Sequence, residues 1–132
     1  MILLDTSVWV EVFRRPSRFR LEDHIDFDDV VTCLPVIQEV LQGFRDPFAH
    51  KRARTAMLAL PIVESPLSLE VYEKAIELYR TARRTGYTVR SSVDCLIAAC
   101  ALKHSLPVLH KDRDFAALAR ASYLEAIPLE LT

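Results

Sequence analysis

The sequence has little glycine, with only Gly43 and Gly86 among its 132 residues. A phosphate-binding turn of the GxGxxG or Walker type needs several closely spaced glycines, so nucleotide binding through such a loop is not expected. An excess of one charge is also lacking, because 17 basic and 18 acidic side chains give a formal net charge of -1. The bulk charge therefore does not by itself indicate a nucleic-acid partner.

Long apolar runs and a recognisable signal sequence are missing as well. No apolar stretch approaches the roughly 20 residues of a membrane span, and no basic region followed by a long apolar segment opens the chain. The cysteines, Cys33, Cys95 and Cys100, are odd in number and form no CxxC pair. This pattern indicates reduced, mostly buried thiols. We therefore expect a cytoplasmic protein with no membrane association.

Short apolar segments alternate with amphipathic ones along the chain. Apolar residues make up 51% of it, enough for one globular domain, which we assign to residues 1–132. Candidate strands lie at 1–4, 30–34, 61–65 and 107–110, with an edge strand within 123–131; candidate helices lie at 6–13, 35–44, 47–60, 68–86, 90–105 and 111–121. The alternation predicts an α/β fold whose central, mostly parallel sheet has four to five short strands and helices on both faces.

Acidic residues recur where the predicted strands end. Asp5 follows the first strand, and Asp112 and Asp114 follow the fourth. Glu39 lies one turn into the helix after the second strand, and Asp94 lies in the first turn of a later helix. Ligands bind beyond the carboxyl ends of parallel strands. Converging carboxylates there would raise one another's pKa or require a cation, and oxygen ligands without Cys or His suit Mg²⁺ or Mn²⁺.

Each acid also has a purely structural interpretation. Asp5 could cap the first helix, and Asp94 suits the positive end of a helix dipole. Asp112 and Asp114 could cap the last helix, and Glu39 could be a solvated helix residue. The recurrence of acids at one predicted edge favours a shared site.

Four stretches of this sequence resemble the PIN-domain family. They are LLDTSVW, LPVIQEVLQGF, SSVDCLIAACA and VLHKDRDF, and they follow one another in the family's order across nearly the whole chain. Within the family they are most similar to the VapC-type toxins, the ribonuclease halves of bacterial toxin–antitoxin (VapBC) pairs. The resemblance implies a three-layer PIN-like fold and metal-dependent hydrolysis of RNA phosphodiester bonds.

The resemblance also assigns roles to individual residues. It implies a catalytic quartet of Asp5, Glu39, Asp94 and Asp112. It implies metal ligands among Asp5, Asp94, Asp112 and Asp114, and leaves open which of the last two lies nearer and whether one metal or two is bound. Thr6 matches a small hydroxyl residue that supports the site, and Ser92 is assigned a similar supporting role. Mg²⁺ or Mn²⁺, a homodimer, and a small VapB-type antitoxin whose tail blocks the acidic pocket are implied as well.

Basic residues near the acidic motifs are candidates for contacts with RNA phosphates. They are Arg14, Arg15, Arg18 and Arg20 after the first helix, and Arg90, Lys111 and Arg113 beside the acids. Taken individually, most of them are expected to be solvated surface charges.

Three other classes share part of this pattern. A receiver domain also has an Asp after its first strand, but it needs a phosphoacceptor Asp after the third, where PIVESP offers only Glu64. A haloacid-dehalogenase phosphatase needs a DxD motif, and here Ser7 occupies the third position. A catalytically inactive RNA- or protein-binding module is the remaining alternative, and an assay of metal dependence would distinguish it from a nuclease.

Overall fold

Five short parallel strands form the central sheet of the protein, whose computed structural model describes residues 1–14, 16 and 19–130. They are β1 (Ile2–Leu4), β2 (Val30–Cys33), β3 (Ile62–Val63), β4 (Val108–His110) and β5 (Ala126–Pro128). The strand order is β3-β2-β1-β4-β5, and every pair is parallel. The chain runs outward from β1 to β3 and then returns to the other side of β1. A topological switch point therefore lies between β1 and β4, where sheets of this type bind ligands.

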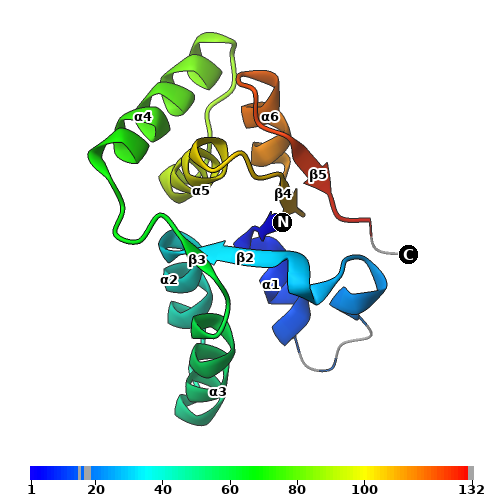
Figure 1. Cartoon of the computed structure of the whole chain (residues 1–132). Helices are drawn as coiled ribbons and strands as arrows, with labels where there is room; N and C mark the ends of the chain where they lie inside the picture. Colours follow the sequence, from blue (N-terminus) through cyan, green and yellow to red (C-terminus); the bar gives the residue numbers. More distant parts are fainter. Residues whose placement is uncertain (15, 17–18, 131–132) are drawn as a thin grey trace.

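Helices cover both faces of this sheet (Figure 1). On one side lie α1 (Thr6–Phe13), α2 (Leu34–Gln42) and α3 (Pro47–Leu58), and on the other lie α4 (Leu69–Arg84), α5 (Ser92–Lys103) and α6 (Arg113–Arg120). Two 3-10 turns, Leu21–Asp23 and Phe27–Asp29, connect α1 to β2. The predicted three-layer α/β fold is confirmed, and the sheet of the described residues is entirely parallel.

Local sequence explains most of the helix boundaries. Ser68 caps α4 by accepting a hydrogen bond from the Val71 N–H, and Gly86 follows the helix with φ 93°, a conformation that glycine adopts readily. The helix expected to end at Leu60 ends at Leu58 instead. Leu60 precedes a proline, and the residue before a proline is disfavoured in helical conformation.

Two of the other boundaries that differ from the sequence prediction involve prolines. The helix expected from Pro35 begins one residue earlier, with Pro35 in its first turn, where no N–H is required. The edge strand expected within 123–131 is limited to β5, because its partner β4 ends opposite Pro128 and a proline cannot continue the hydrogen-bonded ladder. The end of that prediction, at residue 131, lies outside the described residues.

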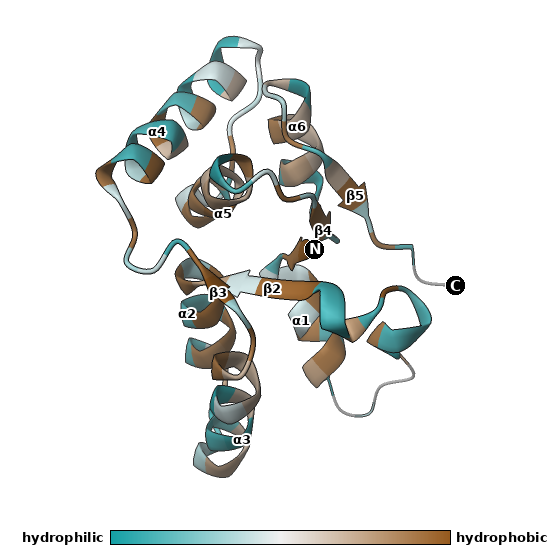
Figure 2. Ribbon diagram, viewed as in Figure 1, coloured by the Kyte–Doolittle hydropathy of each residue, from teal (hydrophilic) through white to brown (hydrophobic). Residues whose placement is uncertain are grey.

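The core lies between the sheet and the helices. Leu3, Leu4, Val31 and Val108 are fully buried, as expected for parallel strands covered on both faces, and the strands are predominantly hydrophobic in Figure 2. In α5, every residue from Ile97 to Ala101 is at most 1% exposed. The three cysteines are free and buried, which confirms that prediction. No helix in the described part of the chain is long and apolar enough to cross a membrane.

Candidate active site

The acids predicted from the sequence converge at the carboxyl edge of the sheet. The carboxylates of Asp5, Glu39 and Asp94 each offer an oxygen within 4.8 Å of the others, and we call them the inner triad. Asp94, Asp112 and Asp114 meet the same criterion and form the outer triad. Asp5 follows β1, Glu39 lies in α2, Asp94 lies in the first turn of α5, and the last two acids lie at the start of α6. Asp94 therefore connects two groups of carboxylates at the switch point.

Asp5 has two structural roles at once. Its Oδ2 accepts hydrogen bonds from Ser7 N at 3.1 Å and Ser7 Oγ at 2.5 Å, and so caps α1. Its Oδ1 is buried and has no hydrogen-bond partner among the described residues. An unpaired carboxylate oxygen away from water is costly unless a proton or a cation binds it. The orphaned oxygen therefore fits a bound cation.

Neighbouring hydroxyl groups hold the inner triad in place. Thr6 Oγ1 donates to Glu39 Oε1 at 2.7 Å, which joins the start of α1 to α2. Ser7 Oγ also accepts a hydrogen bond from Lys111 N at 2.9 Å. This contact connects the carboxyl end of β1 with that of β4, so the two strands present their acids in a fixed relation.

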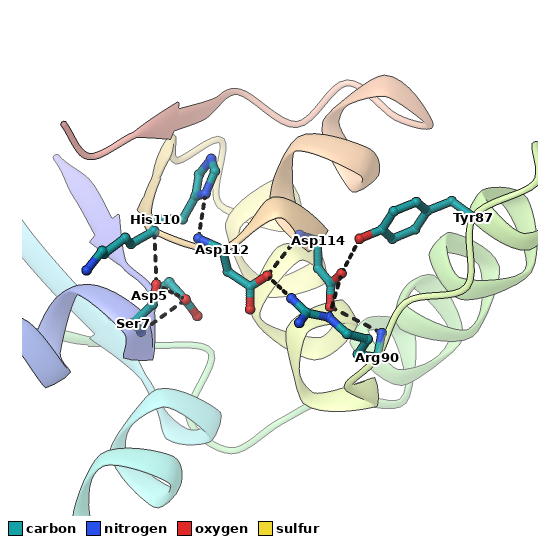
Figure 3. Close-up of polar contacts among 8 residues, drawn as sticks. Asp5, Ser7, Tyr87, Arg90, His110, Asp112 and Asp114 are labelled. Carbon is teal, nitrogen blue, oxygen red and sulfur yellow. Dashed lines mark hydrogen bonds and ion pairs between the residues drawn. The ribbon is translucent and has the colours of Figure 1, made fainter.

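Two acids of the outer triad, Asp112 and Asp114, lie in a network of hydrogen bonds (Figure 3). Asp114, which is 1% exposed, accepts from the Tyr87 hydroxyl and from Arg90 N, the latter at 3.1 Å. The Arg90 guanidinium reaches Asp112 Oδ1 at 2.8 Å. Asp112 caps α6 through Asp114 N, and its own N–H donates to Nδ1 of the buried His110. The outer acids are thus tied to the segment that precedes α5.

Burial and mutual repulsion shift the pKa values of these acids. Burial raises the pKa of Asp5 to about 6, against the hydrogen bonds from Ser7 that lower it. Burial raises the pKa of Asp94 to about 8, and the charges of Asp5 and Asp112 raise it further. Burial also acts to raise the pKa of Asp114, but hydrogen bonds from Tyr87 and Arg90 outweigh it, and the net shift is downward. The metal-free site therefore favours a protonated Asp94 at neutral pH.

This electrostatic arrangement predicts how the stability of the metal-free protein depends on pH. A carboxyl group in an unfolded chain loses its proton near pH 4, whereas folded Asp94 loses it near pH 8. Between those values the folded state holds the extra proton, so the free energy of unfolding falls as the pH rises, by about 1.4 kcal/mol per pH unit at most. Denaturant titrations in chelator should show wild type losing stability relative to Asp94→Asn over this window. Parallel pH profiles of the two proteins would contradict the raised pKa of Asp94.

The other predicted site residues are more dispersed. Ser91, not Ser92, caps α5, and Ser92 is exposed as the first helical residue. Lys111 Nζ and Arg14 Nη2 both pair with the buried Glu11, at 2.8 and 3.5 Å. The remaining candidates are Arg20 and Arg113, which are exposed, and Arg15 and Arg18, which lie outside the described residues.

Sequence reasoning overlooked three residues that organise the acids. Ser7 could have been found, because its position two residues after Asp5 is typical of a hydroxyl that bonds a capping side chain. Tyr87 carries no such signal, because its contact with Asp114 spans 27 residues. His110 lies two residues before Asp112, but histidine is not among the residues whose side chains commonly bond the local backbone. Burial lowers the pKa of His110, which favours the neutral ring that accepts the Asp112 N–H.

A PIN-domain family profile matches residues 2–121, a range that contains all five acids. The chain belongs to the PIN-domain family. Ribonuclease VapC11 of Mycobacterium tuberculosis is 36% identical to this PIN protein over 131 residues, which cover 96% of this chain and 97% of the relative. The resemblance to VapC-type ribonucleases is therefore confirmed over 96% of the chain.

Solved structures agree with this assignment. VapBC-5 from Mycobacterium tuberculosis, a member of the VapBC family of toxin-antitoxin systems, matches with a TM-score of 0.72 at 25% identity, over 97% of this chain and 98% of that one. VapBC2 from Rickettsia felis, solved bound to a promoter DNA fragment, matches with a TM-score of 0.78 at 16% identity, over 98% of this chain and 100% of that one. The second likeness supports the PIN fold alone.

Proposed function

We propose that this PIN-domain protein is a metal-dependent endoribonuclease toxin whose single domain spans residues 1–132. The observation that supports this most strongly is the sharing of Asp94 between the two triads at the switch point of the sheet. Asp5 Oδ1, which has no hydrogen-bond partner among the residues that the structure describes, adds independent support for a cation. The similarity to VapC ribonucleases indicates RNA as the substrate class.

In this proposal each acid has a distinct position and role. The metal ligands are Asp5, Asp94, Asp112 and Asp114, and Glu39 joins Asp5, Asp94 and Asp112 in the catalytic quartet. A bound Mg²⁺ or Mn²⁺ would polarise a phosphoryl oxygen and make bound water more acidic. The protein supplies rigidity, because Thr6 fixes Glu39 and Ser7 fixes Asp5.

The same proposal accounts for how RNA approaches an acidic edge. Arg90 and Arg113 are exposed beside the outer triad, where their side chains can contact phosphates. Lys111 and Arg14 form ion pairs with Glu11, so they contribute less to contacts with RNA phosphates. Arg15 remains a candidate from its place in the sequence.

We further propose a small VapB-type antitoxin as the partner, in a cytoplasmic complex that contains a homodimer of the toxin. The support is the likeness to VapBC-5, a member of the VapBC family of toxin-antitoxin systems. A free acidic nuclease site would be harmful to the cell that makes it. An antitoxin segment carrying a cation would neutralise that site.

The test is RNA cleavage by the purified chain, and we expect it to require a divalent cation. Oxygen-only ligands suit Mg²⁺ or Mn²⁺, so cleavage should appear on adding either ion and stop in excess EDTA. Sequencing RNA ends after induced expression should reveal the target. Undiminished cleavage in chelator would contradict the metal mechanism, and binding without cleavage under any metal would favour the inactive binding module.

A further inference from the structure

Arg90 already supplies a positive charge to the outer triad. Its Nη2 lies 2.8 Å from Asp112 Oδ1, and its Nε lies 3.4 Å from Asp114 Oδ1. Figure 3 shows the guanidinium between these two carboxylates. Asp5 and Glu39 are the two acids that belong to the inner triad alone. In the part of the chain that the structure describes, neither forms an ion pair with a lysine or arginine. The two triads therefore differ in their need for a cation.

We propose that Arg90 is a built-in counter-cation that competes with a divalent ion for the outer triad. The inner triad would then take the first cation tightly, and the outer triad would take a second one only when the guanidinium leaves Asp112. This inference rests on the proposed function, because it assumes that the acids hold cations.

The contacts of Arg90 allow it to be displaced without disturbing the acids. The Arg90 side chain is 57% exposed and that of Asp112 is 27% exposed, and ion pairs in contact with water are weak and screened by salt. Asp114 keeps two other donors, the Tyr87 hydroxyl and the Arg90 backbone N–H. The backbone contact also keeps Arg90 beside the site. A displaced guanidinium could then bind a phosphate oxygen of RNA.

The experiment is a calorimetric titration of Mn²⁺ into the full chain and two matched variants. Arg90→Gln removes the pairing charge, and Arg113→Gln removes an equal charge from a neighbouring exposed residue. Arg113 pairs with neither Asp112 nor Asp114 in the described structure. In wild type we expect a tight and a weak binding event. Arg90→Gln should strengthen the weak event about tenfold, within the usual range of coupling between sites, and leave the tight event nearly unchanged.

Arg113→Gln should leave both affinities close to wild type. Arg90→Lys retains the charge but has fewer hydrogen-bond donors. The Mn²⁺ affinity of its weak binding event should lie between those of wild type and Arg90→Gln. Thermal melting in chelator supplies a second readout, because Arg90→Gln should lower the melting temperature more than Arg113→Gln, and added Mn²⁺ should remove that difference.

The possible results separate the inference from the function on which it rests. If Arg90→Gln and Arg113→Gln strengthen the weak Mn²⁺ binding event equally, the effect is one of general charge. The proposal that Arg90 competes with the cation would then be overturned. Two Mn²⁺ events that Arg90→Gln leaves unchanged would overturn it too, with the metal-dependent nuclease intact. Absence of Mn²⁺ binding in every variant would overturn both.

Discussion

Replacing Asp94 by asparagine is expected to abolish RNA cleavage and relieve the growth arrest caused by unpartnered expression. Asp94 is the only acid common to the two triads in the described structure, so the substitution removes ligand charge from both. We expect at least about a thousandfold loss in cleavage rate, equivalent to about 4 kcal/mol of transition-state stabilisation. The measurements are the initial rate on a labelled RNA and colony counts after induction.

The fold should survive this substitution. Asn has nearly the shape of a protonated Asp, and the raised pKa of Asp94 means that its protonated form dominates near neutral pH without metal. Metal-free Asp94→Asn should therefore melt above wild type near pH 7, because only wild type releases this proton on unfolding, and the two proteins should melt alike near pH 4. Glu73→Gln, which removes the charge of an exposed acid on α4, is the matched control and should remain toxic. A folded Asp94→Asn protein with full toxicity would place Asp94 outside the reaction.

The substitution Asp5→Asn should separate helix capping from metal binding. Asn caps a helix about as well as Asp, so the hydrogen bond from Ser7 N to residue 5 can persist. In the described part of the chain Asp5 Oδ1 has no hydrogen-bond partner. The amide puts a neutral group there and removes a buried charge close to Glu39 and Asp94. We expect the metal-free protein to melt at the same or a higher temperature, while Mn²⁺ affinity and cleavage fall at least about a hundredfold.

Ser7→Ala is the matched control for Asp5→Asn. It leaves every charge in place and removes the hydroxyl that donates to Asp5 Oδ2 and accepts from Lys111 N. The free energy of unfolding should fall by about 1 kcal/mol, with a smaller loss of Mn²⁺ affinity than in Asp5→Asn. If Asp5→Asn keeps wild-type melting, metal affinity and cleavage, Asp5 is only a cap.

The sequence by itself determined the secondary-structure elements and the α/β fold class. Apolar runs of strand length alternate with amphipathic helices. This alternation is a local property of the sequence and can be recognised without tertiary information. Helix starts at Thr6 and Leu69 could be predicted closely because Asp5 and Ser68 cap them. The convergence of acids also followed, since parallel strands have their carboxyl ends at one edge. Among the boundaries that were wrong, those at Leu58 and β5 depended on a proline and on the length of a partner strand.

Only the tertiary structure decided how the acids differ from one another. The sequence does not show that Asp94 belongs to two triads or that Arg90 pairs with Asp112. Nor does it show that one oxygen of Asp5 lacks a hydrogen-bond partner among the described residues. The contact between Arg90 and Asp112 joins residues 22 positions apart, and its existence depends on how α5 and α6 pack on the sheet. The pKa of each acid depends in turn on burial and on its charged neighbours. A sequence can bring the right residues to one edge, but packing sets the distances and the solvent exposure that determine their chemistry.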